Sequence, residues 1–141
     1  MTIIYEKVIL ITKEFIDMNS HVNNVVFLQF MQDVALEHSA INGYTLKRYK
    51  ELQTTWMAKK HCINYIKPVF LGQKIKIKTW IDTISKTFAI RKYEFFNEED
   101  NTLVCEAEST WVYIDLKKNR PCKIDEDMKK AFLTSTKKKD N

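Results

Sequence analysis

The sequence predicts an α+β domain in which a curled antiparallel sheet of about five strands wraps around one long central helix. Three observations lead to this class. Residues 25–41 form a helix-length segment that is apolar nearly all round. Beyond it, apolar and polar residues alternate with the period of two that strands show. A sheet must bury one face, and this helix nearly all of its surface, so the sheet is expected to curl around the helix.

The first part of the chain predicts one strand followed by the helix. Residues 2–15 are rich in β-branched and apolar residues, which favours a strand with much of both faces covered. Polar residues in the helical segment are spaced at i, i+3, i+4 and i+8, which places them in one narrow stripe. They are Gln29, Gln32, Asp33 and Glu37. Gly43 provides a stop, and residues 45–53 are expected to form a short helix or turn.

The rest of the chain predicts four further strands and a short terminal helix. The predicted strands cover residues 54–66, 74–84, 87–96 and 102–115. Short turns between them indicate an antiparallel meander. In residues 123–133 acidic residues precede lysines, which is the charge order of a helix. A strand, a buried helix and such a meander make up the hotdog fold, whose open sheet edges favour pairing into a dimer.

The chain length of 141 residues suits a single domain that buries about two thirds of its unfolded surface. We expect residues 1–136 to form this hotdog domain and the basic residues 137–141 to be a disordered tail. The apolar run at the N-terminus contains Glu6 and Lys7, so it resembles neither a signal peptide nor a membrane span. The expected location is therefore the cytoplasm, with no membrane partner.

Cysteine usage and charge narrow the range of functions. The three cysteines show no C-x-x-C spacing and no paired histidine, so neither a disulfide framework nor a metal site is expected, although Cys105 has the pattern of a core residue. The net charge of +5 permits attraction to nucleic acid, nucleotide phosphates or an acidic carrier protein. The sequence contains no helix-turn-helix, zinc-finger or RNP-type motif, which argues against a nucleic-acid partner.

The densest group of polar side chains is the run DMNSHVNN at residues 17–24, directly before the long helix. Turn and cap formation is the ordinary role of such residues, because Asn, Asp and Ser side chains bond to nearby backbone. The presence of an acid and a histidine in the same short run suggests a chemical role in addition.

Three segments resemble a known family. DMNSHVNNVVFLQFMQD, INYIKPVFLGQKIKIKTWI and STWVYIDLKKNRPCKI are similar to segments of the acyl-CoA thioesterases of the 4-hydroxybenzoyl-CoA thioesterase type. The first also resembles the opening motif of plant-type acyl-ACP thioesterases. The resemblance extends over about residues 5–124, and its first motif is the most specific.

The resemblance implies roles for three residues of the first motif. Asp17 occupies the position of the catalytic carboxylate, while Asn19 and His21 fall on polar positions that the acyl-ACP branch associates with its active site. An Asx-turn is the alternative role for Asp17, and local structure is the alternative for the other two. The chain departs from many bacterial relatives at Ser20, where they keep a glycine.

The resemblance also implies that the helix start binds the reacting group. Asn23 and Asn24 open the helix, where Asn23 either caps it or contacts substrate, and a backbone N–H of Asn24 or Val25 is expected to polarise the thioester carbonyl. A helix N-terminus offers unsatisfied N–H groups and about half a positive charge, which suits an oxyanion. Asp17 would then activate water or attack directly as a nucleophile.

Other polar residues lie outside this motif. Gln29 and Gln32 replace glutamates of many relatives, and their stripe is interpreted as a face toward a second subunit or solvent. Lys59, Lys60 and Arg91 are candidates for binding the phosphates of coenzyme A near a subunit boundary, with a solvated strand surface as the alternative.

The resemblance implies a thioesterase that converts acyl-CoA to free acid and CoA without metal or organic cofactor. The alternatives are an acyl-ACP thioesterase, a non-catalytic acyl-CoA-binding hotdog protein, and a hydratase or dehydratase on the same fold. We expect a homodimer, or a tetramer or hexamer built from dimers. The acyl chain length and any aromatic preference depend on a pocket between helix and sheet that the sequence does not place.

Overall fold

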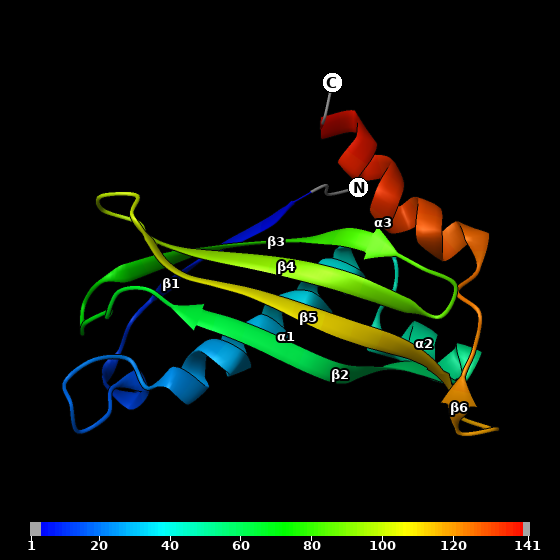
Figure 1. The fold of residues 1–141 in the computed structure, drawn as a ribbon, viewed down its shortest axis with the longest axis horizontal. Coiled ribbons are helices and arrows are strands. Elements are labelled where there is room, and N and C mark those ends of the chain that lie inside the picture. Colours follow the sequence, from blue (N-terminus) through cyan, green and yellow to red (C-terminus); the bar gives the residue numbers. More distant parts are fainter. Residues whose placement is uncertain (1–3, 140–141) are drawn as a thin grey trace.

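The structure, a computed structural model, describes residues 4–139, with side chains as far as residue 133. The elements in chain order are β1 (Tyr5–Leu10), the 3-10 helix η1 (Lys13–Phe15), α1 (Asn24–Ile41), α2 (Leu46–Leu52), β2 (Thr54–Tyr65), β3 (Lys74–Ile84), β4 (Phe88–Asn97), β5 (Leu103–Asp115), β6 (Arg120–Pro121) and α3 (Glu126–Lys139) (Figure 1).

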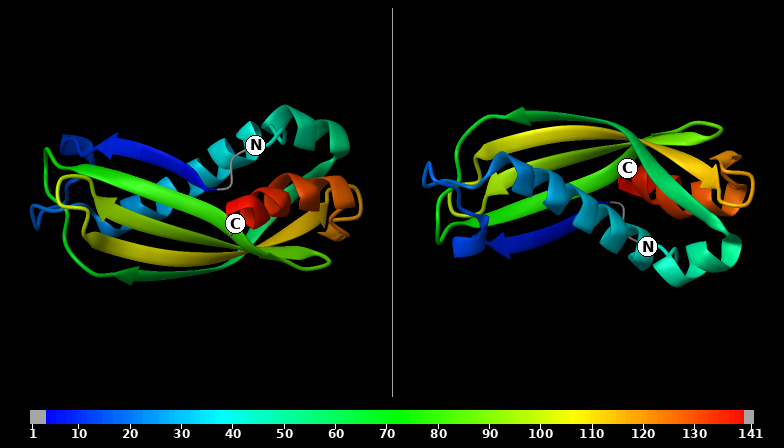
Figure 2. Two further views of the ribbon diagram at one scale, coloured as in Figure 1. Left: turned by 90° about the horizontal axis from the view of Figure 1, so that it is seen from above. Right: turned by 90° about the horizontal axis from the view of Figure 1, so that it is seen from below.

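The strands form one antiparallel sheet. Their spatial order is β1-β3-β4-β5-β2, and the short β6 pairs with β5. The sheet curls along α1, and α3 packs beside β3 (Figures 1 and 2). The predicted class, a curled antiparallel sheet around one long helix, is therefore confirmed. β1 and β2 lie at the two edges, so each has one side without a partner strand in the described chain.

The core lies between α1 and the inner face of the sheet. Alternation in β3 buries one set of side chains and leaves the lysines between them more exposed, as predicted. The buried residues from α1, β3 and β4 include Phe27, Met31, Val34, Ile75, Ile77, Tyr93 and Phe95. The sheet covers only one side of α1, since Val25 remains 69% exposed and Leu36 50% exposed. In one chain the helix is therefore less buried than the sequence predicts.

The two ends of the chain differ from expectation. β1 is shorter than the predicted strand, and Val8 and Leu10 on its outer side are 48% and 50% exposed. The prediction that both faces are covered is wrong here, because only one side of this edge strand packs on the helix. At the other end the backbone of residues 137–139 continues α3. Residues 140 and 141 lie outside the described residues, so the disorder expected of the tail stays a prediction.

No helix in residues 4–139 has the length and apolar character needed to cross a membrane. The three cysteines are free thiols. Cys105 is fully buried on β5, and this burial raises the pKa of its thiol to about 12. Its assignment to the core is confirmed, and it carries no thiolate at neutral pH.

Candidate active site

The motif before α1 folds into a tight turn. The backbone N–H of Asp17 donates to the carbonyl of His21, and the N–H of Ser20 donates to the carbonyl of Asp17, both at 3.1 Å. An isolated bridge between Ile16 and Val22 closes the turn. Ser20 has a φ of 66°, a left-handed conformation that glycine adopts without strain. The glycine of many relatives suits this position, whereas the left-handed conformation is unfavourable for the Ser20 backbone.

One carboxylate oxygen of Asp17 forms a hydrogen bond within the turn. Its Oδ1 accepts the backbone N–H of Asn19 at 2.8 Å, the geometry of an Asx-turn. The other oxygen has no hydrogen-bond partner among the described residues, and the side chain is partly buried. The turn role predicted as an alternative is thus present, and one oxygen is left to bind a water molecule or a substrate. Asn19 contacts Asp17 through its backbone, and its side chain is exposed.

The start of α1 is brought next to this turn by the backbone. The N–H of Asn23 donates to the carbonyl of Phe15, two residues before Asp17. Asn23 is the helix N-cap, and its side-chain oxygen accepts the N–H of Val25 at 3.0 Å. The cap therefore engages one of the two amides predicted to polarise a carbonyl. The N–H of Asn24 makes no hydrogen bond within the described residues, so it is the open donor.

A cavity of about 200 Å³ lies in front of this helix start. Asn24, Phe27 and His21 form one wall, and the segment from Tyr65 to Val69 forms the other. The hydroxyl of Tyr65 donates to the Asn24 carbonyl at 3.0 Å, which ties the end of β2 to the helix. Tyr65 was not among the predicted site residues, although it lies in the second family-like segment, INYIKPVFLGQKIKIKTWI.

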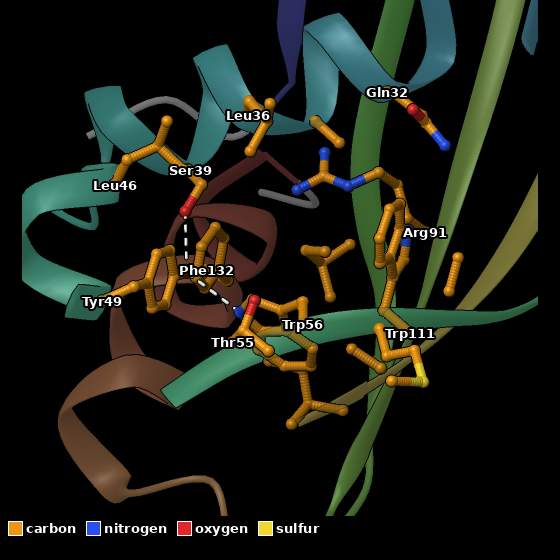
Figure 3. A pocket seen from close by; sticks show the side chains of 16 residues that line it. Gln32, Leu36, Ser39, Leu46, Tyr49, Thr55, Trp56, Arg91, Trp111 and Phe132 are labelled. Carbon is orange, nitrogen blue, oxygen red and sulfur yellow. Dashed lines mark hydrogen bonds between the residues drawn. The ribbon is translucent and has the colours of Figure 1, made fainter. Parts of the chain in front are cut away.

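A second, larger cavity of about 470 Å³ lies farther along α1, between this helix, β2 and the inner face of the sheet (Figure 3). Most of its walls are apolar, and the lining residues include Leu36, Trp56, Trp111 and Phe132. Its polar groups include Ser39, Tyr49 and Trp56, which are hydrogen-bonded to one another. A cavity between helix and sheet is therefore present, and its role in acyl preference stays a prediction.

The three basic residues predicted to bind phosphates do not face the same way. Lys59 and Lys60 are exposed on β2. Lys60 pairs with Thr110 on β5, whereas Arg91 on β4 pairs with Ser109, so Arg91 projects from the opposite side of the sheet. Arg91 is only 4% exposed and lines the larger cavity. The alternative of a solvated strand surface is therefore wrong for Arg91.

A curled sheet around one helix, with a polar turn at the helix start, defines the class of hotdog-fold proteins. The model of the acyl-ACP thioesterase N-terminal domain matches residues 3–132. The protein therefore belongs to this thioesterase family, and the predicted resemblance is confirmed. No curated protein sequence matches the chain. The residues that the structure describes contain no group of three or more His, Cys, Asp and Glu placed to hold a metal ion.

Solved structures agree with this fold. A Staphylococcus aureus protein in complex with CoA has a TM-score of 0.90 at 20% identity, over 95% of this chain and 84% of that one. The DHNA-CoA thioesterase of Staphylococcus aureus gives 0.86 at 18% identity, over 98% and 95% of the two chains. An acyl-ACP thioesterase from Bacteroides thetaiotaomicron gives 0.79 at 19% identity, over 84% of this chain and 49% of that one. At these identities the likeness shows the fold.

Proposed function

We propose that the protein hydrolyses acyl-CoA thioesters to a free acid and CoA, with the reaction at the start of α1. The observation that carries this proposal is that Asn24, whose N–H makes no hydrogen bond within the described residues, lines a cavity and is close in the chain to a carboxylate with one unengaged oxygen. Family membership supports a thioester as the substrate. Such a bond needs a nucleophile at the carbonyl carbon and a donor at the carbonyl oxygen, and it needs no strong acid, because a thiolate leaves readily.

In the proposed mechanism Asp17 acts as the general base. Its unengaged oxygen binds a water molecule and takes a proton from it as the water attacks the carbonyl carbon. The Asn24 N–H, at the positive end of the α1 dipole, stabilises the oxyanion that forms. Collapse of this intermediate releases the CoA thiolate and the acid. Direct attack by the Asp17 carboxylate would instead form an anhydride, which water then hydrolyses.

The other motif residues have supporting roles in this scheme. His21 forms part of the cavity wall, where its ring packs edge-on against Phe70 at 6.5 Å between centroids. Asn19 acts through its backbone N–H, which fixes the rotamer of Asp17. Asn23 holds the helix start, and Val25 has its amide committed to that cap. Lys59 and Lys60, exposed near a sheet edge, remain candidates for the phosphates of CoA.

We further propose a homodimer formed through β2. This strand is an unpaired edge, and Met57 on it is 56% exposed, near the half-exposed Leu36 of α1. If two β2 strands pair antiparallel, the Tyr65 end of one approaches the Thr54 end of the other.

Hydrolysis of acyl-ACP is the second candidate. The matching family model describes acyl-ACP thioesterases, and the net charge of +5 suits an acidic carrier protein. For CoA, the support is that one structural neighbour was solved in complex with it. Rates of thiol release from the same acyl group on CoA and on carrier protein decide between the two.

The central test compares Asp17→Asn with the wild type on acyl-CoA. We expect kcat to fall by on the order of 10²–10⁴ with the fold intact. Asp115→Asn is the matched control, because Asp115 also accepts the N–H of the residue two positions on, Lys117, and pairs with Thr54 at the opposite end of β2 from the small cavity. If Asp17→Asn keeps full activity, Asp17 is not the base. If both variants lose activity equally, the loss reflects turn structure.

A further inference from the structure

The larger cavity contains a buried cation whose hydrogen-bonding capacity is only partly used. Arg91 is 4% exposed, and its guanidinium projects from β4 toward α1 (Figure 3). Its Nη1 donates to Nδ1 of His38 at 3.0 Å and to Oγ1 of Thr79 at 3.1 Å. Because a guanidinium only donates, Nδ1 of His38 must be the acceptor. The Thr79 hydroxyl in turn donates to the Lys92 carbonyl, so the guanidinium is held by groups with fixed orientation.

These contacts occupy the two hydrogens of Nη1. A guanidinium carries five N–H donors, so the donors on Nη2 and Nε have no acceptor among the described residues. Neither Nη2 nor Nε of Arg91 is among the fully buried side-chain atoms of the described chain that lack a hydrogen-bond partner, so each keeps some accessible surface. Arg91 lines the larger cavity, and these two donors are therefore available to a ligand there. A fixed fork of donors thus faces an otherwise mostly apolar space.

The charge of Arg91 also lacks a counterion. No Asp or Glu of the described chain lies within salt-bridge distance of it. Burial lowers the pKa of its guanidinium, yet an arginine stays protonated in proteins. Buried charges are normally paired, because an unpaired one loses the solvation that water gives it. The cavity is therefore complementary to a ligand that brings an anionic oxygen to Arg91.

The position of Arg91 indicates where on the ligand that oxygen lies. Arg91 on β4 and His61 on β2 both pair with Ser109 on β5, so the three residues lie side by side across the sheet. His61 is four residues from Tyr65, which lines the small cavity. At 3.3 Å per residue, Arg91 lies about 13 Å along the strands from the level of Tyr65, whose hydroxyl contacts the helix start. The anionic group must then lie far from the thioester carbon, at the distal end of an extended acyl group.

We propose that the larger cavity is the acyl site and that Arg91 selects acyl groups with a distal carboxylate, so that the preferred substrates are thioesters of dicarboxylic acids. This inference rests on the proposed thioesterase function for its kinetic consequence, and on the cavity alone for its binding consequence. The carboxylate accepts two parallel hydrogen bonds from Nη2 and Nε, the bidentate geometry that an arginine fork provides. The apolar walls enclose the methylene chain between the two ends.

Binding tests the inference independently of catalysis. We would measure calorimetrically the affinity of the full chain for two thioether analogues that cannot be hydrolysed, decyl-CoA and ω-carboxydecyl-CoA. We expect the wild type to prefer the carboxylate by roughly 10- to 100-fold, the range of a charge-assisted hydrogen-bonded pair. Arg91→Met should remove this preference and leave the affinity for decyl-CoA equal or higher. Lys92→Met, next in sequence but on the outer side of the sheet, should keep it.

Kinetics on decanoyl-CoA, 10-hydroxydecanoyl-CoA and decanedioyl-CoA completes the test. We expect decanedioyl-CoA to have the highest kcat/KM in the wild type and to lose that advantage only in Arg91→Met. Equal affinities for both thioethers in the wild type, or a preference that survives Arg91→Met, would overturn the proposal. A preference for the hydroxyacyl substrate would overturn the carboxylate assignment. If no thioester is hydrolysed but the thioether preference depends on Arg91, the proposed catalysis fails while the binding site stands.

Should Arg91→Met fold poorly, Arg91→Lys provides the second variant. It retains the charge without the planar fork, so it should keep part of the preference for the carboxylate thioether. A preference unchanged in Arg91→Lys would exclude the bidentate geometry. The thermal midpoint of each variant, measured without ligand, separates a folding defect from a change in selectivity.

Discussion

Replacing the helix cap Asn23 by aspartate should separate the stability of α1 from its catalytic use. The Asn23 side-chain oxygen accepts the Val25 N–H at 3.0 Å, and an aspartate can make the same bond. A negative charge at a helix N-terminus is favourable by about 0.3–1 kcal/mol at an exposed site. We therefore expect Asn23→Asp to raise the free energy of unfolding slightly. Asn23→Ala, which removes the cap, should lower it by about 1 kcal/mol, a fall in Tm of about 3–5 °C.

Catalysis should respond in the opposite direction. An oxyanion bound at the Asn24 N–H would lie about 6 Å from a carboxylate at the neighbouring position 23, because consecutive Cα atoms are about 3.8 Å apart and both groups extend from the backbone. At an effective dielectric constant of about 20, two like charges at that separation repel by about 3 kcal/mol. Position 23 is exposed, so we discount this value to about 1–2 kcal/mol, a fall in kcat of roughly 5- to 30-fold.

The assay is steady-state thiol release, with chemical denaturation of the same samples. Because the repulsion is screened by salt, the activity of Asn23→Asp should recover partly as ionic strength rises, whereas that of Asn23→Ala should not. An Asn23→Asp variant that is more stable and fully active at low salt would refute the placement of developing negative charge at the start of α1.

Three further predictions concern the surroundings of the site. Tyr65→Phe removes the hydroxyl that donates to the Asn24 carbonyl, and we expect a loss of about 0.5–1.5 kcal/mol in denaturation, together with a lower kcat/KM; unchanged values would show that the contact does not position the helix. Burial lowers the pKa of His61, so below about pH 6.5 the unfolded chain binds a proton that the folded chain does not. The free energy of unfolding should therefore fall as the pH falls through this range, and His61→Gln should flatten that part of the profile in urea titrations; equal slopes would assign the effect elsewhere. Met57→Lys places a charge on the proposed β2 interface, and light scattering should show a shift from dimer toward single chains, whereas an unchanged mass would exclude this edge as the interface.

The periodic elements of this fold were predictable from the sequence, because their patterns have only one physical explanation. The residues of β3 alternate strictly, so its inner face follows from the pleat. The apolar segment 24–41 exceeds the length of a strand and could be buried only as a helix. The extent of β1 was less certain for a physical reason: β-branched residues favour extended backbone, but an edge strand ends where its single partner ends.

The candidate site was predictable in residue type but not in detail. The motif indicated a helix start with a nearby acid, yet the choice of amide depends on the Asn23 cap, and a cap's hydrogen bond has no sequence signal beyond the residue type. The orientation of Arg91 was likewise not predictable from the sequence. The segment 88–96 has apolar residues on both faces, so its sequence does not indicate which face meets the helix. Only the register through Ser109 and His61 places Arg91 inside.

The proposed dimer through β2 and the proposed selectivity of Arg91 for a carboxylate are linked, because a second subunit would change the exposure of the larger cavity to water. Leu36 and Met57, which line that cavity, are 50% and 56% exposed in the single chain. A second subunit on β2 would cover them and exclude water from the space that Arg91 faces. The attraction between the guanidinium and a carboxylate strengthens as water leaves, and so does the cost of leaving the guanidinium unpaired. The selectivity of the wild type for a distal carboxylate should therefore weaken on dilution, in proportion to the loss of dimer, even though Arg91 is unchanged.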